Sequence, residues 1–364
     1  MKNAKRMFLF GLSLLLMLAP LQAGAAQAAG ALVHITQVDN SKFPQMTLYV
    51  SATDSKGEPM GVNPDQLQIS ENGVVIKPNK VSGSGDIGQL TTLLVMDVSG
   101  SMNNAGKLSA AKAAAQAYVD QMRPGDQAGL LTFNTKVTYV QTITSDHAAL
   151  SQAINSLNAK NDTAMFDALA QADQILQDYP GRKAIIVLTD GMDNQSKKTS
   201  DQVIQAIGTS GLSISTIGLG NPDSAGPYFG LDESALKSLA EQAGGVYSYA
   251  NNQADLSKLY ELYGRALQSE YRITYTSPST LRDGLGRTLT VSLGETASAK
   301  AKYNPGGVLP EVASPASWTI FLGFLLILIV LLFIPGVVNR FLVHNTARVR
   351  LVSSQNARSR IKLK

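Results

Sequence analysis

Two kinds of hydrophobic patterning divide this chain of 364 residues. Between residues 90 and 267, short apolar runs alternate with longer segments of helical periodicity. Uninterrupted apolar runs are typical of strands buried on both faces, as in the middle of a parallel sheet. On both sides of this region apolar and polar residues alternate, which is typical of strands with one buried face. The pattern therefore predicts a central α/β domain between two β segments.

The central region predicts a βα alternation. We expect strands at Thr92–Asp97, Gln127–Phe133, Lys136–Thr142, Ala184–Thr189, Ser213–Gly218 and Val246–Tyr249. We expect helices at Lys107–Met122, His147–Leu157, Ala164–Asp178, Ser200–Thr209, Glu233–Ala243 and Gln253–Leu267. Except for a hairpin around Asn134 and Thr135, every connection passes through a helix. The expected fold class is α/β, with a doubly wound, mostly parallel, six-stranded Rossmann-like sheet over residues 90–267.

The flanking β segments, residues 30–86 and 270–304, are each too short to bury a good core alone. Asn72-Gly73 lies between two β-prone runs and is a strong hairpin signal. The later segment alternates clearly from Tyr271 onward. We expect residues 270–304 to pair with residues 30–80 in a β-sandwich, because the ends of an inserted compact domain often lie close together.

The two ends of the chain predict export and a membrane anchor. Residues 1–28 combine a basic start, an apolar stretch and small-x-small cleavage sites, which is typical of a signal peptide. Residues 305–316 form an expected stalk, and residues 317–338 are uncharged and long enough for one C-terminal transmembrane helix. The tail, residues 339–364, carries only basic charges, so we expect it to be cytoplasmic and the α/β domain extracytoplasmic in a single-pass protein of a bacterial cell membrane.

Composition narrows the possible chemistry. The chain has no cysteine, which excludes disulfides, thiolate metal sites and thiol nucleophiles. The net charge of +4 arises at the two ends, and the middle of the chain is about −6. We therefore expect no nucleic-acid partner. The three histidines are far apart in sequence, so a histidine-based metal cluster or catalytic triad has little material.

Candidate chemistry begins where the first central strand ends. The apolar run Leu93–Met96 stops at Asp97, and Ser99 and Ser101 follow at alternate positions. One carboxylate and two hydroxyls suit a hard divalent cation such as Mg²⁺, which prefers oxygen ligands and keeps some of its waters. The same residues also suit a strand-end acid followed by serines that cap the next helix.

Two later segments favour the metal site. Thr163 lies at the start of a predicted helix, and Asp190 ends a second buried-strand run. In this order, the three segments resemble the metal-ion-dependent adhesion site of the von Willebrand factor type A family, and the resemblance covers about residues 91–266. It implies that the metal ligands are Asp97, Ser99, Ser101, Thr163 and Asp190, the hydroxyls binding directly and the aspartates directly or through water. The nearby Asp167 and Asp193 are candidates to support the ligands from behind, although we expect solvated surface acids at both positions.

The resemblance also implies a function. In the family, a Glu or Asp of a protein partner completes the shell of the metal, which can be Mg²⁺, Mn²⁺ or Ca²⁺. We therefore expect a divalent-cation-dependent protein-binding module, for adhesion or scaffolding, and no enzyme. A subunit of a membrane secretion or pilus-type assembly is an open alternative. A Mg²⁺-dependent phosphoryl-transfer enzyme is a further one, although no glycine-rich phosphate loop or nucleophile elbow is present.

Overall fold

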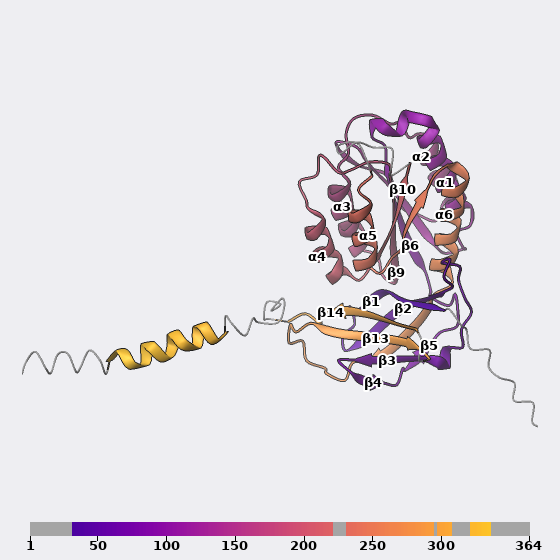
Figure 1. The fold of residues 1–364 in the computed structure, drawn as a ribbon. Coiled ribbons are helices and arrows are strands. Elements are labelled where there is room, and N and C mark those ends of the chain that lie inside the picture. The colour runs from indigo at the N-terminus through magenta and orange to yellow at the C-terminus, as the bar shows by residue number, and fades with distance from the viewer. Residues whose placement is uncertain (1–30, 221–230, 295–296, 308–320, 336–364) are drawn as a thin grey trace, which may run out of the picture. The chain divides into compact units, whose positions relative to one another are not determined.

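The computed structural model describes residues 31–220, 231–294, 297–307 and 321–335. Residues 31–305 of these belong to one compact unit, apart from residues 283–285. This unit combines a three-layer α/β domain with a pair of smaller β-sheets (Figure 1).

The α/β domain is built on a six-stranded sheet with the order β11-β10-β9-β6-β7-β8. Its strands are β6 (Leu90–Asp97), β7 (Gln127–Phe133), β8 (Val137–Thr144), β9 (Arg182–Thr189), β10 (Ser213–Leu219) and β11 (Tyr247–Ala250). All neighbours are parallel except the β7–β8 hairpin. The expected doubly wound, mostly parallel sheet is thus confirmed. Strand β6 is buried at every residue, as its apolar run requires.

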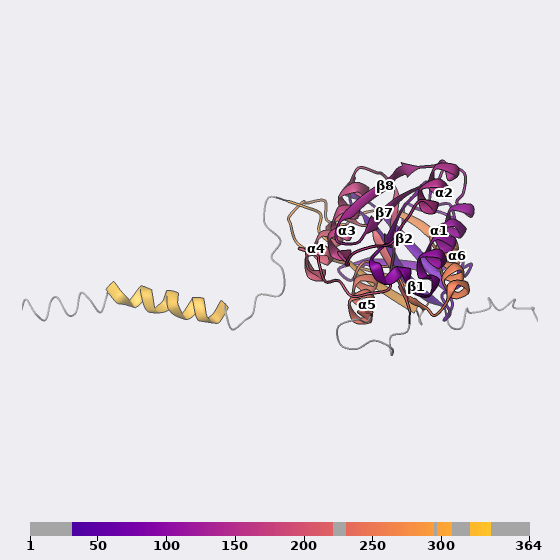
Figure 2. The same ribbon diagram turned by 90° about the horizontal axis from the view of Figure 1, so that it is seen from above.

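Helices cover both faces of this sheet (Figures 1 and 2). They are α1 (Lys107–Asp120), α2 (His147–Asn155), α3 (Met165–Gln177), α4 (Ser200–Ser210), α5 (Glu233–Gln242) and α6 (Gln253–Gln268). The first, second and sixth pack in one core with Leu94 and Ile186 of the sheet, and the other three pack in a second core with Leu93 and Ile185. Successive residues of one strand therefore point into opposite layers, which the unbroken apolar runs allow.

The remaining strands form two four-stranded antiparallel sheets with the orders β1-β2-β12-β5 and β14-β13-β3-β4. Their bounds are β1 (Leu32–Asp39), β2 (Gln45–Thr53), β3 (Leu67–Glu71), β4 (Val74–Ile76), β5 (Lys80–Val81), β12 (Tyr271–Thr276), β13 (Arg287–Leu293) and β14 (Ala297–Tyr303), with the 3-10 turn η1 (Pro64–Gln66) before β3. Strands from before and after the α/β domain share each sheet, and the two sheets enclose one apolar core. The domain boundaries suggested by the sequence stay predictions.

A buried ion pair joins the α/β domain to these sheets. Arg182, the first residue of β9, and Glu270, between α6 and β12, are 0% and 1% exposed. The guanidinium donates from Nε to Glu270 Oε2 at 2.6 Å and from Nη2 to Glu270 Oε1 at 2.8 Å. The side chain of Gln37 on β1 accepts from the same guanidinium at 3.2 Å. These contacts therefore hold together β9, β1 and the link between α6 and β12, which are far apart in sequence.

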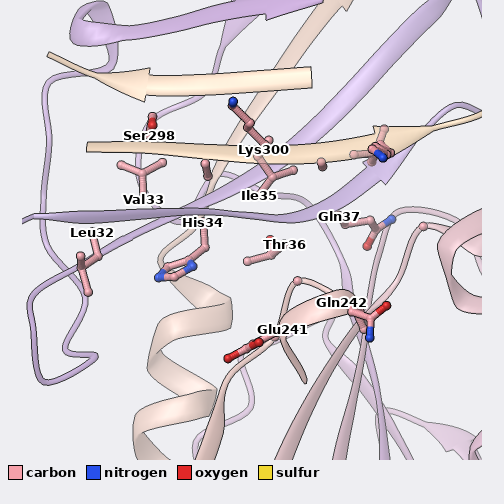
Figure 3. A pocket seen from close by; sticks show the side chains of 18 of the residues that line it. Leu32, Val33, His34, Ile35, Thr36, Gln37, Glu241, Gln242, Ser298 and Lys300 are labelled. Atoms are coloured by element: carbon pink, nitrogen blue, oxygen red, sulfur yellow. The ribbon is translucent and has the colours of Figure 1, made fainter. Parts of the chain in front are cut away.

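Edge strand β1 approaches the α/β domain closely at a glycine turn. Gly244, just after α5, has a φ of 67°, and a Cβ placed on it would lie 2.6 Å from the carbonyl oxygen of Ile35. Only a residue without a side chain allows this approach at this φ. The same edge lines a groove of about 560 Å³ together with β14 and the segment 241–245; His34, Glu241 and Lys300 are among its lining side chains (Figure 3).

The expected C-terminal transmembrane helix over residues 317–338 is wrong. The structure describes a helix of 15 residues there, at 321–335. Among the described residues, no helix is both long and apolar enough to span a bilayer. The single-pass topology inferred from that span loses its basis. The expected signal peptide (1–28), the tail (339–364) and all of the expected stalk after residue 307 lie outside the described residues.

Candidate metal centre

The candidate site lies at the carboxyl edge of the central sheet. Asp97 is the last residue of β6, and Asp190 directly follows β9, its neighbour in the sheet. The carboxyl ends of neighbouring parallel strands meet at one edge, where doubly wound folds bind their ligands. Both carboxylates therefore face the loops that precede α1 and α3. The first of these loops contains the 3-10 segment η2 (Gly100–Gly106).

Asp97 is fully buried and is fixed by two donors. Its Oδ1 accepts from the backbone N–H of Ser99 at 2.8 Å, and its Oδ2 accepts from Thr189 Oγ1 at 2.6 Å. Burial raises the pKa of Asp97 to about 6, although the hydrogen bonds from Ser99 and Thr189 favour the charged form. The carboxylate therefore costs free energy when it is ionised without a nearby cation.

A chain of short contacts joins the two loops. The hydroxyls of Ser99 and Ser101 lie 3.0 Å apart, and Ser101 Oγ donates to Asp190 Oδ1 at 2.6 Å. Because the Ser101 proton points to a carboxylate, Ser99 is the donor of the hydroxyl pair. Hydroxyls that donate their protons in this way keep oxygen lone pairs free for a cation. Ser99 is buried and Ser101 is half-buried, so these oxygens are largely shielded from solvent.

A lysine that the sequence analysis missed takes part in the site. Lys107, the first residue of α1, donates from Nζ to Asp190 Oδ2 at 2.6 Å. The Asp190 side chain is fully buried and the Lys107 side chain is 24% exposed. The ammonium therefore compensates the charge of one of the two carboxylates. The available signal was a basic residue six positions after Ser101, on the helix that leaves the loop.

Thr163 is held beside Asp190 by the loop after β9. Its N–H donates to Asn194 Oδ1 at 3.1 Å, and its carbonyl accepts from the N–H groups of Asn194 and Gln195. A Cβ placed on Gly191 would lie 3.9 Å from Thr163 Oγ1, so this hydroxyl borders the residue that follows Asp190. The backbone N–H of Gly100 donates to the carbonyl of Asn161 at 2.7 Å. This bond joins the loop after β6 to the segment that carries Thr163.

Two other acids, Asp193 and Asp167, support these loops, which is one of the two roles considered for them from the sequence and differs from the expected solvated surface acids. Asp193 Oδ2 accepts from the N–H of Phe166 at 2.9 Å and from Ser196 Oγ at 2.6 Å. The Asp167 carboxylate accepts from the N–H groups of Lys197 and Lys198. Their carboxylates thus satisfy backbone donors, which organises the loop that carries Asp190 and the start of α3.

The donor set fits a hard divalent cation. The site offers two carboxylates and three hydroxyls and contains no imidazole or thiolate, which matches the oxygen preference of Mg²⁺, Mn²⁺ or Ca²⁺. The site has only two acidic residues. In the described part of the chain, no three or more acidic, histidine or cysteine side chains lie close enough together to hold a metal ion. A cation here would therefore depend on hydroxyls, water and an outside ligand.

The sequence has recognisable relatives. Residues 92–192 match the family model described as the von Willebrand factor type A domain. A UPF0353 protein of Mycolicibacterium paratuberculosis is 26% identical over 208 residues, which cover 50% of this chain and 62% of that protein. Human calcium-activated chloride channel regulator 1 is 28% identical over 195 residues, which cover 51% of this chain and 20% of that protein. The chain thus spans less than two thirds of either relative.

Solved structures with a similar chain course are more distant in sequence. A von Willebrand factor type A protein from Catenulispora acidiphila has a TM-score of 0.46 at 15% identity, over 76% of this chain and 73% of that one. The conserved hypothetical protein BatB from Bacteroides thetaiotaomicron has a TM-score of 0.41 at 21% identity, over 50% of this chain and 100% of that one. Proximal thread matrix protein 1 from the mussel byssus, with a zinc-occupied metal-ion-dependent adhesion site, has a TM-score of 0.45 at 22% identity, over 54% of this chain and 49% of that one.

Proposed function

Because this chain contains a von Willebrand factor type A domain, we propose that it is a protein-binding module for adhesion or scaffolding whose binding depends on a divalent cation. Domains of this family generally serve as interaction modules. The observation that carries the proposal is the contact chain from Ser99 through Ser101 to Asp190 at the carboxyl edge of the two central strands.

The metal would be held by residues of three loops. Ser99, Ser101 and Thr163 would supply hydroxyl oxygens, and Asp97 and Asp190 would act directly or through water. When bound, the cation supplies a positive charge that attracts a carboxylate. The protein offers two carboxylates, one of them already paired with Lys107. The ion would therefore keep enough positive charge to bind an Asp or Glu of a partner protein.

The same geometry gives little support to phosphoryl transfer. Such chemistry needs a positioned nucleophile or water and cationic groups that clamp the phosphate. Among the described residues of the site, Lys107 already forms an ion pair with Asp190 at 2.6 Å, so its ammonium does not clamp a phosphate. The hydroxyls of Ser99 and Ser101 bond each other and the Asp190 carboxylate, which is itself held by Lys107. We therefore propose a binding role without catalysis.

Panning a random peptide library against the immobilised protein tests this function. We expect peptides enriched in Mg²⁺ to contain Asp or Glu and to elute with EDTA. The Asp190→Asn variant should lose this enrichment, whereas Asp120→Asn, a change of an exposed acid on α1, should keep it. Equal enrichment in Mg²⁺ and in EDTA would contradict metal-dependent binding.

A further inference from the structure

A cleft at the opposite end of strand β9 has the features of a second binding site. It has a volume of about 580 Å³, within the range of pockets that hold small organic ligands. Its lining comes from the sheet β1-β2-β12-β5 on one side and from the segment Gln177–Lys183 on the other. Lys183 is the second residue of β9 and Asp190 directly follows the strand, so at about 3.3 Å per residue the two are roughly 23 Å apart.

Strand register builds the floor of the cleft from two rows of side chains. In one row Gln37, Tyr49 and Arg272 are cross-strand partners, and the N–H of Ser82 bonds the carbonyl of Arg272. In the next row Asp39, Thr47, Thr274 and Lys80 are partners. The residues between these rows, such as Leu48 and Ile273, point into the opposite apolar core. The polar face of this sheet is thus turned toward the α/β domain.

The charge of the cleft is predominantly positive. Its cationic lining residues are Lys42, Lys80, Lys183 and Arg272, and its acidic ones are Asp39 and Asp178. Arg272 has a carboxylate partner, Asp86, at 3.8 Å. Within the part of the chain that the structure describes, the three lysines form no ion pair. The four cationic side chains therefore outnumber the two acidic ones in the lining, and a concave surface with more cationic than acidic groups favours an anion.

Two residues of the lining, the buried Ser82 and the half-buried Lys183, would gain a partner from such an anion. Ser82 is 2% exposed, and its hydroxyl has no hydrogen-bond partner among the described residues. Ser82 is one of the residues that line the cleft, and a buried hydroxyl without a partner is costly, so a ligand group that reached this hydroxyl would gain a hydrogen bond. Lys183 is half-buried; burial lowers its pKa, while Asp39 and Asp173 act against that shift. An anionic ligand would relieve both costs.

We propose that this cleft binds a small hydroxylated anion, such as a sugar bearing a phosphate or a carboxylate. The lysines and Arg272 would meet the anionic group. The hydroxyl and amide side chains of Ser41, Gln45, Thr47, Ser82 and Thr274 would meet the sugar hydroxyls. Tyr49 and Tyr179 add ring surface to the lining. The site is independent of the metal centre and of its partner.

Calorimetric titration of the full chain in EDTA tests the site. The probes are glucose 6-phosphate, glucuronate and, as a neutral match, glucose. We expect binding of at least one anion and none of glucose, and the stronger anion identifies phosphate or carboxylate as the natural group. The presence of EDTA removes any contribution of the metal centre, so failure of the proposed function would not affect the result.

Three variants decide whether binding occurs in this cleft. Ser82→Ala removes one hydrogen bond and should raise Kd about tenfold without harming the fold, because the hydroxyl has no partner in the protein. Lys183→Met keeps the apolar stem and should raise Kd at least tenfold. Lys258→Met, at an exposed position of α6, is the matched control and should leave Kd unchanged. The proposal is overturned if neither anion binds, or if the first two variants bind like the wild type.

Discussion

Removing the negative charge from the buried ion pair should destabilise the whole structured unit. In Glu270→Gln the side chain keeps its size, but the amide nitrogen replaces one of the two oxygens that accept from Arg182 at 2.6 and 2.8 Å. One charge-assisted hydrogen bond is lost, worth about 1.5–3 kcal/mol. The guanidinium, 0% exposed, is also left without a counter-ion. Together these effects should lower the free energy of unfolding by about 3–5 kcal/mol.

Urea unfolding, followed by circular dichroism, measures this change. The control is Glu58→Gln, which breaks the surface pair with Arg265, whose side chains are 51% and 47% exposed. That change should cost less than about 1 kcal/mol. The double variant Arg182→Met with Glu270→Leu should recover most of the lost stability, because it removes both buried charges. A cost of Glu270→Gln no larger than that of Glu58→Gln would refute the reasoning.

Three further predictions concern the site and the glycine turn. Burial raises the pKa of Asp97 to about 6, well above the usual range of an aspartate, so the metal-free fold is most stable when Asp97 is protonated. In EDTA, the free energy of unfolding should therefore fall by up to about 3 kcal/mol between pH 4 and pH 7 relative to Asp97→Asn, and a pH-independent difference would contradict this. Lys107→Met frees the Asp190 carboxylate and should tighten Mg²⁺ binding about tenfold in calorimetry, whereas unchanged or weaker binding would mean that the ammonium does not compete. Gly244→Ala places a Cβ against the β1 backbone and should cost about 2–4 kcal/mol in urea unfolding, clearly more than Gly73→Ala, which has a similar positive φ but open space around it.

The alternation of elements in the α/β domain could be predicted because its strands are buried on both faces. The unbroken run Leu93–Met96 is short and is followed by turn signals, which favours a buried strand over a helix, and the structure places it in the middle of the sheet. Helix ends were less well defined: α1 was expected to reach Met122 and ends at Asp120. Ends depend on capping and on the chain that follows, and hydrophobic periodicity carries little of that information.

The meeting of Ser99, Ser101 and Asp190 follows from sheet geometry, because carboxyl ends of neighbouring parallel strands share one edge. Metal binding by these residues stays a prediction. The Lys107–Asp190 contact joins residues 83 positions apart and depends on the direction in which α1 leaves its loop. The pairing of Arg182 with Glu270, 88 positions apart, depends on how the strands after α6 dock. The local pattern of apolar and polar residues predicts neither the course of α1 nor the docking of these strands.

The failed expectation of a membrane span shows a different limit. Residues 317–338 are uncharged, and an uncharged apolar stretch of that length is the usual signal of a transmembrane helix. Among the described residues, however, no helix combines the length and the hydropathy that a membrane span needs.

The most direct test of the metal centre is calorimetric titration of Mg²⁺ and Mn²⁺ into the purified protein, with Asp97→Asn and the exposed-acid control Asp120→Asn alongside. The account predicts one specific site in the wild type and in Asp120→Asn, with binding lost in a folded Asp97→Asn variant. Equal metal uptake by the wild type and by Asp97→Asn would contradict the assignment of this edge of the sheet as the metal site.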